Sequence, residues 1–461
     1  MGNDIIFEPL KFRNLTVKNR LFRSSISGRF DNYDGSGSQA RVNWEESFAR
    51  GGIGAIISSY VPINLKGRIL PNYAMIDSDD KIPFWRSVGQ AVHKYDCKFI
   101  VQLSHSGRQR DNPGVENFME KGLSSTSKSD SVHGLLCEAM TLQQIKDTIR
   151  DFAEGARRVR EAGLDGVELH ASHGYLITQF LSSAINDRTD EYGGSLRNRA
   201  AFLLEIIQAI RKEVGNDYHV QAKLNAVDFG NALYPWEKKG TTLDEGIQFA
   251  KWAEEAGVDA IHVSIGSTFP HPLLPSGGLP VDELNWWYGA IISSGKRAYM
   301  NYTLFHFKLL QPIYTFLWNR TKKDHPVEAV CAEYAREVKK NVSVPIITTG
   351  GYQDGKVIRR VITEGYTDGV SMARPVIANR DLPQILQSGR DLPPKPCTFC
   401  NRCLVNAPAN PLGCYDVRRF DNDRDAMIAE IMNVYKPSQF SEQSMSAAVL
   451  SDWREKVKSN A

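Results

Sequence analysis

The stretch EAGLDGVELH, at Glu161–His170, decides the fold because three other parts of the chain align with it without gaps. The aligned copies are EAGVDAIHVS from Glu255, EGYTDGVSMA from Glu364 and RGGIGAIISS from Arg50. In each copy a small residue or glycine ends a helix, and the apolar run that follows is typical of a strand buried on both faces. One position of the repeat holds Asp165, Asp259, Asp368 or, in the remaining copy, Gly54. The repeat predicts a parallel sheet covered by helices.

Four more apolar runs complete a set of eight predicted strands. They are NRLFRSS near Leu21, KFIVQLSH from Lys98, HVQAKLNA from His219 and VPIITTGG from Val344. Between the strands, apolar residues recur at helical spacing, as at Ile145, Ile149, Phe152, Ala156 and Val159. Strands that alternate with helices in this number favour an α/β fold of the (β/α)8 TIM barrel type over an open doubly wound sheet.

The repeat also changes the expected number of domains. A chain of 461 residues would make roughly three domains of about 150 residues each. The repeat instead assigns residues 1–390 to one barrel, with an insertion at about 270–325 between strands six and seven. Residues 391–461 then form a short C-terminal extension that contains cysteines.

Charge and composition exclude several classes of protein. Lys and Arg number 56 against 53 Asp and Glu, a net charge of +3, which gives no reason to expect a nucleic-acid partner. The N-terminus has no secretory signal, and no uncharged apolar run reaches the roughly 18 residues that a spanning helix needs. Seven cysteines without a signal peptide predict reduced thiols and a cytoplasmic protein.

Strand ends should carry the chemistry, because the active site of such a barrel lies at its C-terminal face. The motif HASHGYL puts His170, His173 and Tyr175 at one strand end. Two imidazoles can donate hydrogen bonds to one developing oxyanion, and a phenol can deliver a proton. A structural role for each histidine and a metal site are the alternatives, but no HExxH motif supports a metal here.

A second group of strand-end residues indicates a phosphorylated ligand or cofactor. Gly350 and Gly351 follow strand seven, and Ala373 and Arg374 follow strand eight. Backbone N–H groups freed by glycines, beside a guanidinium, form a phosphate site where barrels commonly hold one. A barrel lyase or aldolase could use the same site for a substrate phosphate, with Lys223 as a Schiff-base amine.

The run from Gln179 to Leu203 can be interpreted as a loop that enters a helix at Ser195, with Arg197 and Arg199 facing water. Its segment NDRTDEYGGSLRNR, however, resembles the old yellow enzyme family of FMN-dependent NAD(P)H oxidoreductases. The other matching pieces are FEPLKFRNLTVKNRL, VQLSHSGRQ, ELHASHGYLITQFLS, TTGG and DGVSMARPVIANRDLP. The barrel of that family agrees with the one predicted from the repeat.

The resemblance implies how FMN would be bound. The implied contacts are Gln102 and Lys223 at the flavin pyrimidine edge, Ser24, Ser25 and Tyr60 through backbone atoms, Ser27 near flavin O4, and Gly350, Gly351, Ala373 and Arg374 at the phosphate. A cation at Lys223 would stabilise the anionic reduced flavin.

The resemblance also implies an ene-reductase reaction on α,β-unsaturated carbonyl compounds. NAD(P)H would reduce FMN, and flavin N5 would then deliver hydride to the β-carbon while Tyr175 protonates the α-carbon. His170 and His173 would bind the substrate oxygen and stabilise developing enolate charge. Either NADH or NADPH could be the donor, and a flavin-dependent dehydrogenase or demethylase is an alternative.

Arg29 departs from the family pattern, because several relatives have an aromatic residue lining the active site at this position. The guanidinium would make the substrate site prefer an acidic substrate. The equally good alternative is a surface pair with Asp31.

The interval between strands six and seven is a second departure, since a βα unit usually needs far fewer residues. Within it, Trp286 to Trp318 carries only three charged residues, and all are basic: Lys296, Arg297 and Lys308. A lid, a packed helical hairpin and a surface that rests on a membrane or a partner are the three interpretations, of which we favour the lid or hairpin.

Cysteine spacing is the third departure. Cys397, Cys400, Cys403 and Cys414 lie close together in CTFCNRCLVNAPANPLGC, a pattern that indicates zinc or a 4Fe-4S cluster. It resembles the cluster motif of 2,4-dienoyl-CoA reductase relatives, although the two later spacings are one residue shorter, so unligated thiols are the alternative. Those relatives continue into a nucleotide-binding domain. The sequence has no strand-linked GxGxxG, so we expect electrons to enter directly at FMN.

Overall fold

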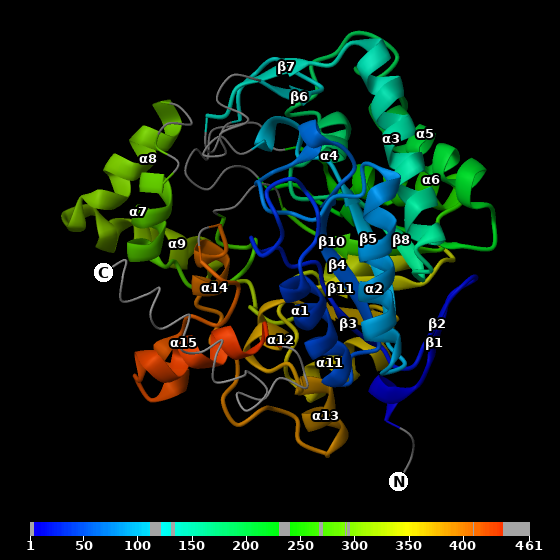
Figure 1. The fold of residues 1–461 in the computed structure, drawn as a ribbon. Coiled ribbons are helices and arrows are strands. Elements are labelled where there is room, and N and C mark those ends of the chain that lie inside the picture. The colour runs from blue at the N-terminus through cyan, green and yellow to red at the C-terminus, as the bar shows by residue number, and fades with distance from the viewer. Residues whose placement is uncertain are drawn as a thin grey trace, which may run out of the picture.

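The computed structural model describes residues 4–110, 121–130, 134–229, 240–266, 271–290, 292, 296–408 and 410–436. Eight parallel strands close into a barrel at its centre, which confirms the predicted TIM barrel (Figure 1). In chain order they are β3 (Leu21–Arg23), β4 (Ala55–Pro62), β5 (Lys98–Ser104), β8 (Gly166–Ala171), β9 (His219–Asn225), β10 (Ala260–Ser264), β11 (Ile346–Thr349) and β12 (Gly369–Met372).

Helices follow the strands and cover the outside of the barrel. They are α1 (Gln39–Arg50), α2 (Ile82–His93), α3 (Leu142–Glu161), α4 (Leu176–Leu181), α5 (Leu196–Val214), α6 (Leu243–Ala256), α10 (Ala332–Lys339), α11 (Gly355–Thr363), α12 (Arg374–Ala378) and α13 (Leu382–Gln387). The expected apolar face of α3 is buried, from Ile145 to Val159. Among the described residues no helix is both long and apolar enough to cross a bilayer.

The aspartate of the repeat has a shared structural role. Asp165, Asp259 and Asp368 each stand just before a strand. Each accepts a backbone N–H at the start of the preceding barrel strand in chain order, from Phe99, Val220 and Ile346 at 2.8, 2.9 and 2.8 Å. These aspartates therefore tie neighbouring strands together at the N-terminal end of the barrel. Gly54 breaks the pattern because Asn19 occupies its place, with Oδ1 only 2.3 Å from where a Cβ would stand.

A short antiparallel hairpin lies at the N-terminal end of the barrel. Its strands are β1 (Leu10–Lys11) and β2 (Thr16–Val17). Its apolar side chains pack against residues at the starts of the barrel strands, including Phe22, Ala55 and Ile347. Because this end is filled, the opposite, C-terminal end is left for a ligand.

Two additions flank the C-terminal end of the barrel. Between β10 and α10 the described chain forms α7 (Val281–Ala290), α8 (Lys296–His306) and α9 (Gln311–Lys322), which project to the left in Figure 1. After the barrel come α14 (Arg402–Asn406) and α15 (Arg424–Asn433). A further short parallel pair, β6 (Gly122–Ser124) and β7 (Cys137–Ala139), follows β5.

Candidate active site

A cavity of about 430 Å³ opens at the C-terminal ends of the barrel strands. Eleven of the predicted catalytic, substrate-binding and flavin-binding residues line it: Ser24, Ser25, Ser27, Arg29, Tyr60, His170, His173, Tyr175, Lys223, Ala373 and Arg374. Gln102 lies beside the wall, in register with Tyr60 across the sheet. Gly350 and Gly351 directly follow Thr349, which lines the cavity.

The histidines and the tyrosine of the HASHGYL motif form one cluster. The ring centroid of His170 lies 5.3 Å from that of His173 and 4.7 Å from that of Tyr175. His173 has a φ of 61°, a left-handed conformation that non-glycine residues rarely adopt. Gln109 stabilises this turn, because its side-chain amide donates to the backbone oxygens of His173 and Gly174.

Burial determines the protonation of this cluster. It lowers the pKa of both His170 and His173 well below the ordinary histidine value, with a further lowering from nearby cations such as Lys223. It raises the pKa of Tyr175 to about 12. At neutral pH the cluster therefore contains two neutral imidazoles and a protonated phenol, which can donate both hydrogen bonds and a proton.

A buried carboxylate orients the polar groups inside the barrel. Glu168 Oε1 accepts from Gln102 Nε2 at 2.7 Å, and Oε2 accepts from Gln221 at 2.5 Å and from His262 Nδ1 at 2.8 Å. Burial alone would raise the pKa of Glu168, but His262 and Lys223 hold it below its ordinary value. Glu168 is thus an anion at neutral pH and can only accept hydrogen bonds.

The orientation of Gln102 fits a flavin. Because its NH₂ group faces Glu168, its Oε1 atom faces away, and in the described chain this buried oxygen has no hydrogen-bond donor. A buried acceptor without a partner costs free energy. The N3–H group at the pyrimidine edge of FMN would supply that missing donor.

Lys223 is the buried cation beside this edge. Its side chain is 3% exposed, and its Nζ has one long hydrogen bond, of 3.4 Å, to Ser24 Oγ. Burial lowers the pKa of Lys223, while Glu168 opposes that shift. An anionic reduced flavin would stabilise the protonated lysine further.

The phosphate end of the predicted site has unused donors. In the part of the chain that the structure describes, the backbone N–H groups of Gly350, Gly351, Ala373 and Arg374 donate to no protein acceptor. A Cβ at Gly351 would lie 2.6 Å from Val327 O, so only glycine allows this close approach. Free N–H groups beside a guanidinium suit a phosphate.

The Arg374 guanidinium lies over the Phe399 ring, with 5.1 Å between its Cζ atom and the ring centroid. Its Nη1 donates to Ser276 O and Asn401 Oδ1, at 2.7 and 2.6 Å. None of the acidic residues that the structure describes forms an ion pair with it, and burial lowers its pKa. A phosphate dianion would provide the missing counter-charge, so these residues fit FMN.

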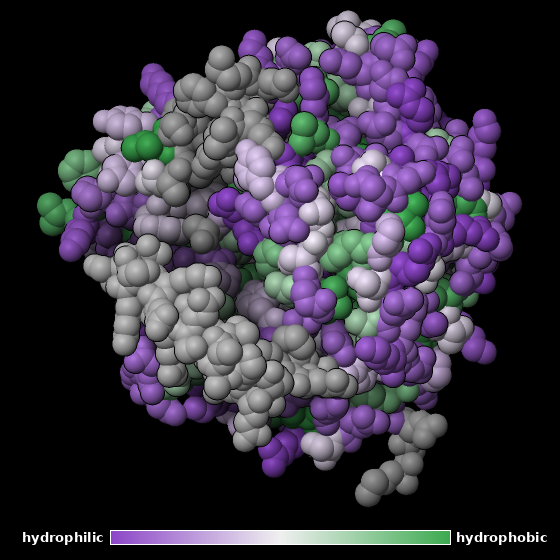
Figure 2. All heavy atoms as spheres, viewed as in Figure 1, coloured by the Kyte–Doolittle hydropathy of each residue, from purple (hydrophilic) through white to green (hydrophobic). Residues whose placement is uncertain are grey.

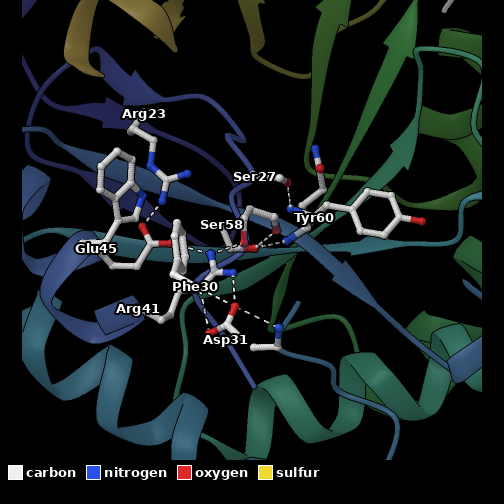
Figure 3. A network of polar contacts seen from close by, with 12 residues as sticks. Arg23, Ser27, Phe30, Asp31, Arg41, Glu45, Ser58 and Tyr60 are labelled. Carbon is white, nitrogen blue, oxygen red and sulfur yellow. Dashed lines mark hydrogen bonds and ion pairs between the residues drawn. The ribbon is translucent and has the colours of Figure 1, made fainter. Parts of the chain in front are cut away.

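Figure 3 shows a buried ionic network beside the segment of β4 that includes Ser58 and Tyr60. Arg23 pairs with Glu45, and Arg41 pairs with both Asp31 and Glu45. All four side chains are fully buried, and their formal charges cancel. This network was not predicted from the sequence, because charged side chains are rarely fully buried and their pattern here does not indicate burial.

The network holds the backbone that would face the flavin. Arg23 donates to Ile57 O at 2.8 Å, and Arg41 donates to the Ser59 hydroxyl. One residue further on, Tyr60 N donates to Ser27 Oγ at 3.1 Å (Figure 3). The Ser27 hydroxyl hydrogen is then available to a ligand atom, as its predicted position near flavin O4 requires.

The family follows from this site and its sequence. The profile of the NADH:flavin oxidoreductase / NADH oxidase family matches residues 5–271 and 313–393. The chain belongs to this family. The predicted resemblance to the old yellow enzymes is therefore confirmed, and the match leaves out residues 272–312 of the insertion.

Two relatives of this flavin oxidoreductase chain are longer than it is. It is 31% identical over 430 residues to an NADH oxidase of Thermoanaerobacter brockii, covering 89% of this chain and 57% of that protein. It is 28% identical over 433 residues to a cinnamate reductase of Clostridium sporogenes, covering 88% and 57%. The chain thus spans somewhat more than half the length of each.

Comparison with a solved structure confirms the fold of this chain. The old yellow enzyme homologue from Zymomonas mobilis superposes with a TM-score of 0.63 at 22% sequence identity. The match covers 85% of this chain and 94% of that one.

Arg29 does not pair with Asp31, so the predicted alternative of a surface ion pair between them is wrong. Asp31 is buried against Arg41, whereas Arg29 lines the cavity and donates to Pro408 O and Asn72 Oδ1, at 2.9 and 3.0 Å. No carboxylate of the described chain lies within 4.0 Å of Arg29. Its guanidinium at the cavity wall is therefore available to an anionic ligand.

The expectation that Arg199 faces water is also wrong. α5 begins after Ser195 as predicted, but Arg199 is buried, pairs with Glu245 and donates to Leu181 O. Arg197 lies over the Trp252 ring, 4.8 Å from its centroid. Arg199 therefore joins α4, α5 and α6, whereas Arg197 is exposed, as expected.

The cysteines of the extension border the cavity. Cys403 lines it, and burial raises the pKa of Cys397 to about 11 and that of Cys403 still further. Across the residues that the structure describes, no three His, Cys, Asp or Glu side chains are arranged to hold a metal ion. The positions of these thiols do not fit a metal centre. The zinc or 4Fe-4S cluster therefore remains a prediction from the cysteine spacing alone.

The polar interior of the barrel was not predicted, although the spacing of polar residues in the strand sequences indicates it. A strand read as buried on both faces should be apolar throughout. Here polar residues recur two apart, and so on one strand face: Glu168 and His170, Gln221 and Lys223, His262 and Ser264. Sequence analysis also missed the extension's apolar contribution to the cavity wall, at Leu404, Val405 and Leu412.

Proposed function

We propose that this chain is an FMN-dependent NAD(P)H oxidoreductase that reduces the activated C=C bond of α,β-unsaturated carbonyl compounds. The observation that carries the proposal is the single cavity shared by His170, His173, Tyr175, Lys223 and Arg374. Family membership favours this reading over a barrel lyase or aldolase, in which the same phosphate site would hold substrate.

Each side chain has a distinct task in this reaction. His170 and His173 donate hydrogen bonds to the substrate oxygen, and these strengthen as enolate charge develops. The Tyr175 phenol gives its proton to the α-carbon. FMN held beside Gln102, Lys223 and Arg374 would supply the hydride for the β-carbon, with NAD(P)H as the source of that hydride. Together with the Tyr175 proton this makes a balanced two-electron reduction.

Arg29 suggests the class of substrate. The cavity wall around it is mostly apolar and includes Tyr73, Leu135 and Trp287. A guanidinium at such a wall pairs well with a carboxylate, through two parallel hydrogen bonds. We therefore extend the proposal to apolar, unsaturated acids, a class that includes the substrate named for the cinnamate reductase relative.

A reducing compartment suits the proposed reaction. All seven cysteines are unpaired, although several lie close together in the extension. Free thiols persist where glutathione and thioredoxin keep them reduced, which supports a cytoplasmic location.

The test separates the two half-reactions of FMN-loaded protein in an anaerobic stopped-flow experiment. With Tyr175→Phe we expect reduction of the flavin by NADPH or NADH at the wild-type rate. Reoxidation by an enone should slow by about 10²- to 10⁴-fold, because a positioned general acid is lost. Arg29→Met should raise the KM for cinnamate by about tenfold and leave that for 2-cyclohexenone unchanged.

Tyr73→Phe is the matched control, since it removes another hydroxyl from the same cavity wall. It should leave both half-reactions close to wild type. The proposal fails if Tyr175→Phe reoxidises as fast as the wild type, or if purified protein stays colourless after FMN is added.

A further inference from the structure

The connection from α8 to α9 exposes an unusual number of large apolar side chains. We call residues 296–323, comprising α8, the turn Lys308–Leu310 and α9, the elbow. Six of its large hydrophobic residues are more than half exposed, and Leu309 is 92% exposed: Tyr299, Phe307, Leu309, Ile313, Phe316 and Leu317. Apolar atoms stand at the edge of the molecule where α7 and α8 lie (Figures 1 and 2). A monomeric soluble protein rarely gathers such residues in one place.

The outward apolar face of α9 follows from the regular spacing of its apolar residues and is not the result of poor packing. Ile313, Phe316, Leu317 and Arg320 follow helical spacing, so they share one side of the helix. The other side is anchored, because Trp318 is buried and its Nε1 donates to Gly277 O at 2.9 Å. The helix is thus held against the protein with its apolar stripe facing outward.

The charge of this region has one sign. Residues 284–323 contain six Lys or Arg and no Asp or Glu. Four of the basic residues form no ion pair within the described chain: Lys296, Lys308, Arg320 and Lys323. Apolar side chains among basic ones are typical of an interfacial surface that inserts between lipid headgroups and pairs with their phosphates.

A second copy of the chain would fit this surface less well than an anionic bilayer would. A two-fold dimer brings the same patch of both subunits together, so the basic residues would face one another without acidic partners in the segment. An anionic bilayer supplies both the apolar phase and the opposite charge. The family profile also skips residues 272–312, so much of this region lies outside what the family shares.

We propose that the elbow is a peripheral membrane-binding surface that recognises anionic lipid. It would dock the protein without spanning the bilayer. The helices of the elbow connect to the cavity, since Tyr288 of α7 packs against Phe305 of α8 and Trp287 of α7 lines the cavity. Docking would therefore place the mouth of the proposed active site beside the lipid surface.

Flotation of the full-length, FMN-loaded protein with vesicles tests the proposal. We expect binding to vesicles of phosphatidylcholine and phosphatidylglycerol at a ratio of about 7:3, and little binding to phosphatidylcholine alone. The double variant Leu309→Ser/Phe316→Ser and the reversal Lys308→Glu/Arg320→Glu should each weaken binding by about tenfold or more. Unchanged flavin absorbance would show that each variant is folded.

Control substitutions outside the elbow distinguish its contribution to vesicle binding from a general change in surface charge or hydrophobicity. Leu392 and Lys146 are exposed residues outside it, so Leu392→Ser and Lys146→Glu should bind vesicles as the wild type does. The proposal is overturned if the wild type does not float with anionic vesicles, or if the elbow variants float equally well. It is likewise overturned if light scattering shows a dimer that Leu309→Ser/Phe316→Ser dissociates while vesicle binding is unaffected.

Discussion

His170 is buried, His173 and Tyr175 are half-buried, and the neutral form of each side chain is favoured over its charged form. The pKa of each histidine lies well below its ordinary value, and that of Tyr175 is raised to about 12, in each case because of burial. Glu168 differs because hydrogen bonds and nearby cations outweigh the effect of burial on its pKa. Side chains within one small site thus hold different protonation states.

This protonation pattern predicts the pH dependence of reoxidation. The Tyr175 proton is present below its pKa of about 12 and is lost only above it. The histidines gain a proton only well below pH 6.5. The rate of flavin reoxidation by an enone should therefore be flat from about pH 6.5 to about pH 10 in stopped-flow measurements. An inflection near neutral pH that His170→Asn abolishes would contradict this assignment.

At the scale of elements, the repeated aspartates join neighbouring strands at the closed end of the barrel. They differ in burial: the side chain of Asp259 is fully buried, that of Asp165 is 13% exposed and that of Asp368 is 26% exposed. Asp259 also pairs with Arg211 at 2.8 Å. Removing it would take the carboxylate from the Arg211 guanidinium and the acceptor from the Val220 N–H.

This difference predicts a graded loss of stability. Asp259→Ala should lower the free energy of unfolding by about 3–5 kcal/mol, because it breaks a buried ion pair. Asp368→Ala should cost about 1–2 kcal/mol, with Asp165→Ala between them. Urea titration followed by circular dichroism measures the series. Asp324→Ala, a change at an exposed aspartate, is the control. Equal losses of stability at all three repeat positions would contradict the predicted dependence on burial.

At the scale of the whole molecule, the C-terminal extension completes the cavity wall from the far end of the chain. The Tyr435 ring stacks on Trp44 of α1, with centroids 5.7 Å apart, and its hydroxyl donates to Leu412 O at 2.6 Å. Leu412 and Cys403 in turn line the cavity. One aromatic contact therefore links the barrel exterior to the shape of the site.

Loss of that contact should loosen the extension while the barrel stays folded. In Tyr435→Ala we expect the Cys403 thiol to react several-fold faster with Ellman's reagent, as located by peptide mass spectrometry. Cys97 and Cys331, buried in the barrel, should stay slow and act as internal controls. Met432→Ala, an exposed change on the preceding helix α15, should have no effect. Equal acceleration at Cys97 would instead indicate unfolding of the whole chain.

The barrel could be predicted because its signals are local. Turn residues, strand patterns and the repeated aspartate lie within about ten residues of one another, and parallel strands with intervening helices have few other ways to pack. The motif residues that line the cavity could be placed for the same reason. They sit at strand ends, and strand ends meet at one face of a barrel.

By itself, then, the sequence determined the closed barrel, the family and the strand-end residues of the site. The tertiary structure decided which partners those residues have. Asp31 pairs with Arg41 and not with Arg29, and Tyr435 packs on Trp44, nearly 400 residues away. Hydrophobic patterning indicates that a side chain will be buried, but the free energy of burial is non-directional and does not specify the neighbour. The protonation states, the cavity wall and the outward face of α9 all depend on those neighbours, so only the folded chain defines them.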